Sequence, residues 1–317
     1  MSSDRDGSKM RDTKHLLSAA DYVALVNDSK VLRQLKVQIS DRLVKETGKA
    51  KTLPGFSYVL RQLKAQISDR PVKESSKAKT LPGFSYPAGR MVDFTIDTQL
   101  LLSDGSYNLR ETVNCPETGF NSRMRAAIQA VEMHEGPEAA MYVMEQKTPL
   151  FRHLLARYPN CVGSEYLGDA VVLGAVDADG LRNEDATRLT FEDARFDCLL
   201  SFEVLEHIPD FHAALREARR VLRDGGRFYF TAPFIPTRHE HLIRARVEDG
   251  KIVHILEPEW HGDPVTGHGI LCFQHFGWSI VDDLRTSGFS NVEALAFDQV
   301  EYGYYTQDPI LVFRAVA

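Results

Sequence analysis

From about residue 136 onward, short apolar runs alternate with amphipathic helical segments, and this alternation restricts the possible folds most strongly. The apolar runs begin near Ala139, Asn160, Phe196 and Arg227, and a further short strand is expected near 181–186. Strands that alternate with helices predict an α/β fold with a doubly wound, mostly parallel sheet.

Two helices between these strands carry clear start signals. The segment 148–159 begins with Thr148 as N-cap and Pro149 in the first helical position, and the segment 210–222 begins with Asp210 as N-cap. Asp-Gly-Gly at 224–226 is expected to end the second helix. A helix at 279–288 and closing strands at 291–300 and 309–317 complete the predicted domain.

The N-terminal part contains a tandem repeat, in which residues 31–58 and 59–86 differ at only four of 28 positions. The repeat carries twelve Lys and Arg against four Asp and Glu, although the whole chain has a net charge of -6. It is either a basic handle for an anionic partner or a solvated arm, and the second interpretation is favoured because the segment has few large apolar residues. The predicted division is a basic arm at 1–86, a small irregular module at 87–135 and the α/β domain at 136–317.

Composition narrows the classes of function. The four cysteines are widely spaced, which argues against a disulfide framework. The chain has no long apolar run and no secretory leader pattern, so a cytoplasmic protein without a membrane partner is expected. The acidic balance argues against nucleic acid as a partner. A homo-oligomer is left open.

Acidic residues follow three successive strands at an interval of twenty residues: Glu145, Glu165 and Asp185. Ligands of an open parallel sheet bind beyond the carboxyl ends of its strands. A carboxylate at such an end can accept hydrogen bonds from the hydroxyls of a ribose or the amino group of an adenine. The alternative is that each is an ordinary turn carboxylate.

The stretch from Phe196 to Phe234, with S-x-E-V-L-E-H-I after a strand and A-R-R-V-L-R-x-G-G-R ending a helix, closely resembles class I S-adenosylmethionine-dependent methyltransferases of the small-molecule "type 11" group. The resemblance implies S-adenosylmethionine as the cofactor and a small molecule as the methyl acceptor. The cofactor-binding residues that it implies, together with the strand-end positions, are Glu145, Gln146, Thr148, Glu165, Tyr166, Asp185, Ala186, Ser201, Phe202, Glu203 and His207.

The sequence departs from that family after the first strand, where most members have a glycine-rich loop that admits the methionine part of the cofactor. Here the segment is MEQKTPLF (144–151), in which Gln146 and the helix start at Thr148 would take over that role. In an alternative alignment, the degenerate glycine-rich loop is at 163–174, and Asp185 is the carboxylate that binds the ribose of the cofactor. The first alignment is preferred because it leaves a full helix between the first two strands.

The chain also resembles bacterial members of this group that carry a small cysteine-rich module before the catalytic domain. The positions of the four metal ligands are here Ser85, Ala88, Cys115 and Thr118. A structural zinc ion needs four thiolate or imidazole donors, so no metal is predicted. The module is expected either to keep its shape by packing or to be disordered.

Six histidines lie between Thr237 and Trp278, in the region that would cover the acceptor. A hydroxyl acceptor needs a general base that titrates near neutral pH, and His261 in EWHGDP is the predicted catalytic residue. The alternative is that these histidines are exposed loop residues. Tyr302, Tyr304 and Tyr305 either line the pocket or belong to a turn around Gly303.

The predicted function is therefore methyl transfer from S-adenosylmethionine to an oxygen or nitrogen of a small molecule, such as a sugar or natural-product scaffold. The alternative is a methyltransferase-derived binding or scaffold protein that no longer transfers methyl groups. A nicotinamide-linked dehydrogenase shares the architecture but has little support, because G-x-G-x-x-G is absent.

Overall fold

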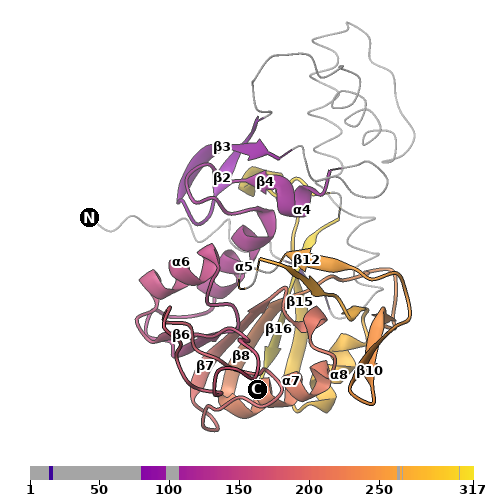
Figure 1. The fold of residues 1–317 in the computed structure, drawn as a ribbon. Coiled ribbons are helices and arrows are strands. Elements are labelled where there is room, and N and C mark those ends of the chain that lie inside the picture. Colours follow the sequence, from indigo (N-terminus) through magenta and orange to yellow (C-terminus); the bar gives the residue numbers. More distant parts are fainter. Residues whose placement is uncertain (1–13, 17–79, 98–106, 263–264, 266, 307) are drawn as a thin grey trace, which may run out of the picture. The chain divides into compact units, whose positions relative to one another are not determined.

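A computed structural model describes residues 14–16, 80–97, 107–262, 265, 267–306 and 308–317, and most of the tandem repeat lies outside these ranges. The chain forms two compact units (Figure 1). Of the described residues, the larger unit contains those in 1–22, 124–297 and 311–317, and the smaller contains those in 23–123 and 298–310. The predicted three-part division at 86 and 135 remains a prediction.

The larger unit is built on a seven-stranded sheet in the order β1-β15-β16-β8-β7-β5-β6. The strands are β1 (Lys14–Leu16), β5 (Met141–Val143), β6 (Cys161–Gly163), β7 (Phe196–Phe202), β8 (Leu222–Thr231), β15 (Ser290–Phe297) and β16 (Ile310–Val316). β6, β5, β7 and β8 are parallel to one another, whereas β16 runs antiparallel to β8. The predicted α/β fold with a mostly parallel sheet is confirmed.

Helices connect the strands as the sequence predicted. α6 (Pro149–Arg157) lies between β5 and β6, α7 (Phe211–Val221) between β7 and β8, and α8 (Ile280–Thr286) between β8 and β15. Because β5 leads toward one edge of the sheet and β7 toward the other, right-handed crossovers place α6 and α7 on opposite faces. α7 and α8 pack beside each other (Figure 1).

Both predicted caps are present in the larger unit. The hydroxyl of Thr148 accepts a hydrogen bond from the amide of Phe151 at 3.1 Å, and the carboxylate of Asp210 accepts one from the amide of Ala213 at 3.0 Å. These contacts satisfy amide groups that have no partner within the helix itself.

The expected role of Asp-Gly-Gly at 224–226 is wrong. α7 ends at Val221, and the three residues lie inside β8. The pairing of β7 with β8 passes from Phe196–Leu222 directly to Cys198–Arg227, so residues 223–226 form a bulge. Gly225 has a φ of 80°, a left-handed conformation that glycine adopts readily in such a bulge.

A long excursion separates β8 from α8 and covers residues 233–278. Its strands are β9 (Leu242–Ile243), β10 (Ala245–Glu248), β11 (Lys251–His254), β12 (Trp260–Gly262), β13 (Gly269–Leu271) and β14 (Gln274–His275). β10 with β11, β12 with β13 and β14 with β9 form three antiparallel pairs. The excursion carries six of the sequence's eleven histidines.

The smaller unit holds a three-stranded antiparallel sheet of β2 (Thr80–Ser85), β3 (Arg90–Ile96) and β4 (Val113–Asn114). Its buried core consists of Phe94, Val113 and Cys115. The hydroxyl of Ser85 donates to the sulfur of Cys115 at 3.3 Å, and Ala88 packs against the same core. Hydrogen bonds from Ser85 and Thr118 lower the pKa of Cys115, although burial opposes the shift. Positions that hold zinc in the resembled module are thus joined by packing and hydrogen bonds.

The three tyrosines near the C-terminus also belong to this smaller unit. Tyr302 packs edge-on against Phe84, and the hydroxyl of Tyr305 donates to the carbonyl of Pro82. Gly303 has a φ of 75°, and a Cβ there would lie 2.1 Å from the ring of Phe94. The turn interpretation of this segment is therefore confirmed. No helix among the described residues is long and apolar enough to cross a membrane.

Candidate active site

The strand order of the larger unit reverses between β5 and β7, and the crevice beyond their carboxyl ends is where an open α/β sheet binds ligands. Glu145 lies there, two residues beyond β5, and is buried. Its carboxylate accepts a hydrogen bond from the amide of Phe202, at the end of β7, at 3.4 Å. A hydrogen bond of Glu145, a predicted site residue, thus links the ends of β5 and β7.

The loop after β5 is short and contains no glycine. The side-chain amide of Gln146 donates to the carbonyl of Gly180 at 2.9 Å and accepts from the amide of Arg182 at 3.0 Å. Thr148 caps α6 with its hydroxyl. Both predicted residues therefore lie at this strand end, and the structure uses their side chains to fix the loop. α6 connects β5 to β6 along the chain, so a full helix separates the first two strands, as the first of the two alignments requires.

Glu165 follows β6 and is buried, and its carboxylate accepts a hydrogen bond from the amide of Lys147 in the neighbouring loop at 2.6 Å. Tyr166 beside it is exposed. Glu165 also forms an isolated parallel bridge with Asn183, which is the short third strand expected from the sequence.

Asp185 follows that bridge by two residues. Its carboxylate accepts hydrogen bonds from the amide and hydroxyl of Thr187 and from the guanidinium of Arg188, at 2.6–3.0 Å. These contacts lower the pKa of Asp185 although burial opposes the shift. The carboxylate is thus held ionised in its own turn, and the half-buried Ala186 lies directly beside it.

The end of β7 supplies Ser201, Phe202 and Glu203. Ser201 and Phe202 are buried, and the Ser201 hydroxyl has no hydrogen-bond partner among the residues that the structure describes. Glu203 has a φ of 62°, a left-handed conformation that is uncommon outside glycine and concentrates at functional positions. The amide of Glu203 donates to the carbonyl of Thr231 at 2.8 Å, which fixes this conformation against β8.

A short 3-10 helix, η2 (Leu205–His207), continues from this strand end and leads into a cluster of titratable side chains. The rings of His207 and His261 lie edge to face with their centroids 5.0 Å apart. Glu206 lies 3.6 Å from both His207 Nε2 and His261 Nδ1. His261 Nε2 donates to Glu259 at 2.9 Å, and His275 Nε2 donates to the same oxygen at 2.9 Å.

The charges in this cluster reinforce one another. Cys272 and Glu206 raise the pKa of His261 to about 11, with a smaller contribution from Glu259, while burial opposes the shift. Burial raises the pKa of Glu206, against the effect of His261. The general-base role predicted for His261 requires a neutral ring, and these neighbours favour the protonated ring.

Three of the six histidines in the excursion are exposed, namely His239, His254 and His268. The other three are partly buried: His261 and His275 belong to the cluster, and His241 bonds Asp283 at 2.7 Å. The interpretation of these histidines as exposed loop residues therefore holds for three of the six.

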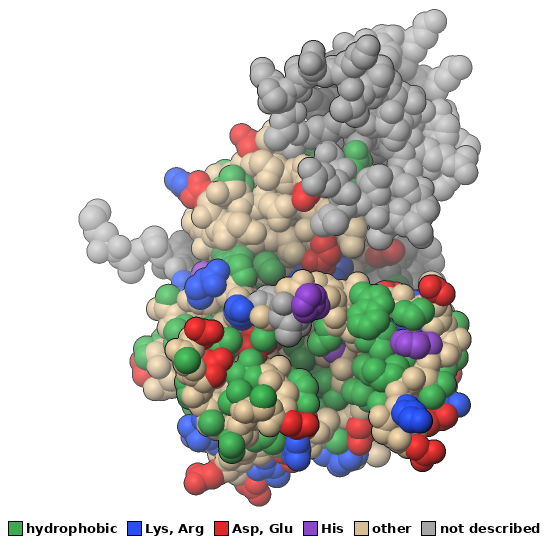
Figure 2. Space-filling view, viewed as in Figure 1, with side chains coloured by type: hydrophobic (Ala, Val, Ile, Leu, Met, Phe, Trp, Pro, Cys, Tyr) green, Lys and Arg blue, Asp and Glu red, His purple; other side chains and the backbone are tan. Residues whose placement is uncertain are grey.

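The excursion also carries exposed apolar side chains. Figure 2 shows hydrophobic side chains gathered on the right of this face, over the region that Figure 1 labels β10 and β12. The exposed apolar residues of this segment are Ile243, Val247, Ile252, Ile255, Leu256 and Trp260. Trp260, which precedes His261 on β12, is 60% exposed.

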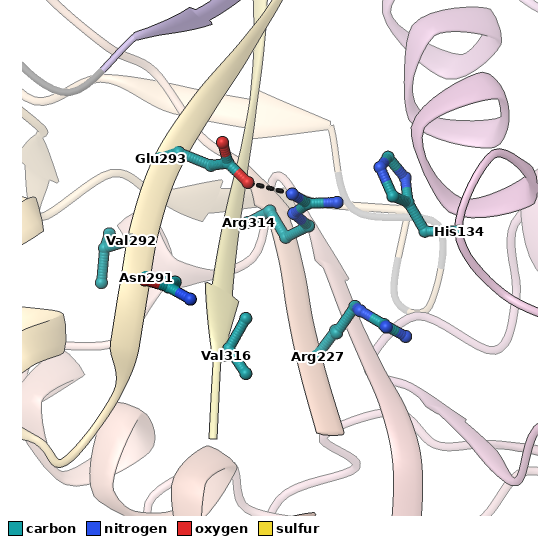
Figure 3. Close-up of a pocket in the computed structure, with 7 residues that line it drawn as sticks. All are labelled: His134, Arg227, Asn291, Val292, Glu293, Arg314 and Val316. Carbon is teal, nitrogen blue, oxygen red and sulfur yellow. Dashed lines mark hydrogen bonds and ion pairs between the residues drawn. The ribbon is translucent and has the colours of Figure 1, made fainter. Parts of the chain in front are cut away.

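A separate pocket of about 510 Å³ lies elsewhere in the larger unit (Figure 3). It is lined by His134, Arg227, Asn291, Val292, Glu293, Arg314 and Val316. Asn291 is near the start of β15, and Arg227 pairs with Cys198 in the first half of β7, so the pocket lies away from the carboxyl ends that hold Glu145 and Ser201. None of the predicted site residues lines it.

Comparison with known proteins decides between the families that share this architecture. Residues 151–230 match the model of a methyltransferase domain. Over these residues the chain is therefore similar to methyltransferases. The matched residues run from α6 to β8 and include Glu165, Asp185, Ser201–Glu203 and His207.

Curated relatives match the methyltransferase domain over short stretches. A demethylmenaquinone methyltransferase of Mycobacterium marinum is 44% identical over 68 residues, which are 19% of this chain and 29% of that protein. The 27-O-demethylrifamycin SV methyltransferase of Amycolatopsis mediterranei is 49% identical over 43 residues, 14% of this chain and 16% of that protein. The chain thus spans less than a third of the length of these two relatives.

Among solved structures, a methyltransferase from Mesorhizobium loti is similar at 18% identity and a TM-score of 0.40, over 62% of this chain and 98% of that one. The glycopeptide N-methyltransferase MtfA, in complex with S-adenosylhomocysteine, is similar at 15% identity and a TM-score of 0.40, over 60% of this chain and 88% of that one.

The cofactor of the methyltransferase domain is S-adenosylmethionine, and the residues at the strand ends fit its chemistry. Glu165 and Asp185 are carboxylates at neighbouring strand ends, and carboxylates accept hydrogen bonds from hydroxyl and amino groups. The buried Ser201 hydroxyl, which lacks a described partner, is a further polar group at the same edge. A buried polar group of this kind generally needs a partner.

Three members of the cluster were not predicted as site residues: Glu206, Glu259 and Cys272. Glu206 precedes His207 directly, and Glu259 lies two residues before His261, so both were adjacent to predicted residues. Cys272 had no local signal. Only the folding of β12, β13 and η2 against one another brings these residues together.

Proposed function

We propose that the protein transfers the methyl group of S-adenosylmethionine to an oxygen or nitrogen atom of a small molecule. The observation that carries this proposal is the single row of site residues from Asp185 through Glu165 and Glu145 to Ser201, at adjacent carboxyl ends around the reversal in strand order. The cofactor supplies an electrophilic methyl group on a sulfonium. The protein's contribution is then binding, alignment and exclusion of water.

In this proposal Glu165 and Asp185 hold the adenosine part of the cofactor. Glu165 is buried and anchored by the amide of Lys147, so its carboxylate is fixed before a ligand arrives. Asp185 is kept ionised by Thr187 and Arg188. Fixed acceptors of this kind reduce the ordering that binding requires.

Glu145, Ser201, Phe202 and Glu203 would lie beside the methionine part. The left-handed conformation of Glu203 supports this assignment, because such strain persists where surrounding contacts over-determine it. The absence of glycine after β5 restricts the backbone's approach on the other side. Gln146 and the capped start of α6 therefore form that wall in place of a glycine-rich loop.

The acceptor would lie between the strand ends and the excursion, next to His261 and Trp260. Exposed apolar side chains on β10–β12 favour an acceptor with an apolar scaffold over a bare sugar. The names of the relatives, which act on a demethylmenaquinone and a demethylrifamycin, agree with a scaffold of this class.

Calorimetric titration with S-adenosylmethionine and S-adenosylhomocysteine tests the proposal. We expect both to bind, and Glu165→Gln to weaken both by at least about tenfold, because removal of a charged hydrogen-bond partner costs about 1.5–3 kcal/mol. Glu192→Gln, at a residue outside the site, is the control. If neither compound binds the wild-type chain at millimolar concentration, the protein is a non-methylating relative of the family.

A second assay identifies the acceptor. Phenolic, quinol and amine compounds are incubated with cofactor carrying a labelled methyl group, and the label is traced to the product. Transfer only to a sugar would contradict the apolar-scaffold assignment while leaving methyl transfer intact.

A further inference from the structure

Glu206 has an unusual environment for a carboxylate. It is fully buried, at 0% exposure, at the centre of η2. Neither of its carboxylate oxygens has a hydrogen-bond partner among the described residues. A buried carboxylate without hydrogen bonds is costly unless it is paired with a cation.

The two nearest histidines present ring nitrogens toward this carboxylate. The other nitrogen of His207, Nδ1, lies 2.8 Å from the carbonyl oxygen of Leu271, which can only accept, so Nδ1 carries the hydrogen. His261 Nε2 lies 2.9 Å from Glu259, whose carboxylate accepts, so the hydrogen is on Nε2. In neutral rings, the lone pairs of His207 Nε2 and His261 Nδ1 are then left for another partner.

The distances around Glu206 fit a common ligand of all three groups. His207 Nε2 and His261 Nδ1 are each 3.6 Å from Glu206 Oε1, too long for a hydrogen bond. Nitrogen and oxygen ligands about 2.0–2.2 Å from a tetrahedral ion lie about 3.3–3.6 Å from each other. All three ligand atoms lie within 4.8 Å of one another.

We infer that Glu206, His207 and His261 bind a divalent transition-metal ion. Two imidazoles and one carboxylate are the ligand set of zinc sites that keep a coordination position open, and also of non-haem iron sites. The ion would satisfy the buried carboxylate and leave a position for water or an oxygen atom of a ligand.

The residues around the ligands support this assignment. Metal-binding histidines commonly donate their second ring hydrogen to a carbonyl or a carboxylate, which orients the ring. His207 does so toward Leu271, and His261 does so toward Glu259. Glu259 is itself held by His275 at 2.9 Å and Arg244 at 3.3 Å.

A second set of potential ligands shares His261 and consists of Glu259, His261 and Cys272. It is the weaker candidate, because Glu259 already has two imidazole partners and an arginine. The carboxylate of Glu206, in contrast, has no described hydrogen bond. The two sets make opposite predictions for variants of Glu206 and Cys272.

The test uses zinc as the probe and the full-length chain. The protein is stripped with a chelator, titrated with Zn²⁺ against a zinc-binding dye, and its bound metal is counted by elemental mass spectrometry after gel filtration. We expect one zinc per wild-type chain. Because zinc is measured directly, the result is independent of cofactor binding and methyl transfer.

Variants assign the ligands. Glu206→Gln, which keeps the shape of the side chain, is expected to abolish stoichiometric binding, and Glu259→Gln to weaken it about 10–100-fold. His254→Ala, at an exposed histidine of β11, and Cys272→Ser are expected to bind as tightly as the wild type. Circular dichroism verifies that each variant is folded.

Two results would overturn the inference. One is a wild-type chain that binds no zinc at micromolar free concentration. The other is loss of zinc in Cys272→Ser with retention in Glu206→Gln, which would assign the ion to the second set. Zinc also raises the thermal midpoint of the wild type if it binds the folded state, and it should not do so for Glu206→Gln.

Discussion

Gly163, the last residue of β6, leaves no room for a side chain. A Cβ at this position would lie 2.5 and 2.7 Å from two ring atoms of Phe151 in α6, and 3.0 Å from Cγ of Gln146. Carbon atoms in contact are normally about 3.5–4.0 Å apart, so the ring must retreat by about 1 Å. Phe151 is buried and cannot move alone, so the whole of α6 is expected to shift.

Gly163→Ala is therefore expected to destabilise the larger unit by about 1–3 kcal/mol, the usual cost of overpacking a close-packed core. For a domain of about 150–250 residues, each kcal/mol lowers the thermal midpoint by about 2–4 °C. The same shift moves Gln146 and the loop that anchors Glu165, so affinity for S-adenosylhomocysteine is also expected to fall.

Chemical denaturation followed by tryptophan fluorescence measures the change in the free energy of unfolding. Gly136→Ala is the matched control, because nothing lies within 4 Å of a Cβ there and its φ is not positive. The control should be neutral or stabilising by up to about 1 kcal/mol. Equal stability of the two variants would refute the overpacking argument.

Three further outcomes follow from particular contacts. Thr148→Ala removes the cap of α6 and should cost about 1 kcal/mol in urea unfolding, whereas Thr237→Ala at an exposed position should cost almost nothing; equal costs would contradict the capping role. Burial lowers the pKa of His134, with Arg314 and Arg227 adding to the shift and the Ala130 carbonyl and Glu293 opposing it (Figure 3). The unfolded chain therefore takes up the proton first, so stability should fall as pH drops below about 6.5, and His134→Gln should remove that part of the slope; an unchanged slope would refute it. Hydrogen bonds from His241 and His212 lower the pKa of Asp283, although burial opposes the shift. The stability that Asp283 adds should therefore be present above about pH 4 and lost in more acidic solution. Asp283→Asn should flatten the acid end of the plot of unfolding free energy against pH, and Asp282→Asn, at an exposed neighbour, should not.

Much of the larger unit was predictable from local sequence because its signals are local. Apolar periodicity identifies α7, whose buried residues include Phe211, Ala214, Leu215 and Ala218. Thr148 and Asp210 mark the starts of α6 and α7, because each caps its helix by a hydrogen bond to the amide three residues later. The bulge at 224–226 was missed because glycine after a helix serves equally as a cap or as the extra residue of a strand, and only pairing with β7 distinguishes the two.

In the candidate site, too, some features were predictable from local sequence and others depend on tertiary contacts. The sequence by itself determined that Glu145, Glu165 and Asp185 follow successive strands and that Ser201 lies near the end of the next one. A parallel sheet brings such residues to one edge. Only the tertiary structure decided that the side chain of Gln146 donates to the carbonyl of Gly180. It also decided that Glu206 lies beside His261, which is 55 residues away in the sequence. Strand ends are ordered by the repeating geometry of the sheet, whereas contacts across the β12–β13 excursion depend on how an irregular segment packs, which no local pattern encodes.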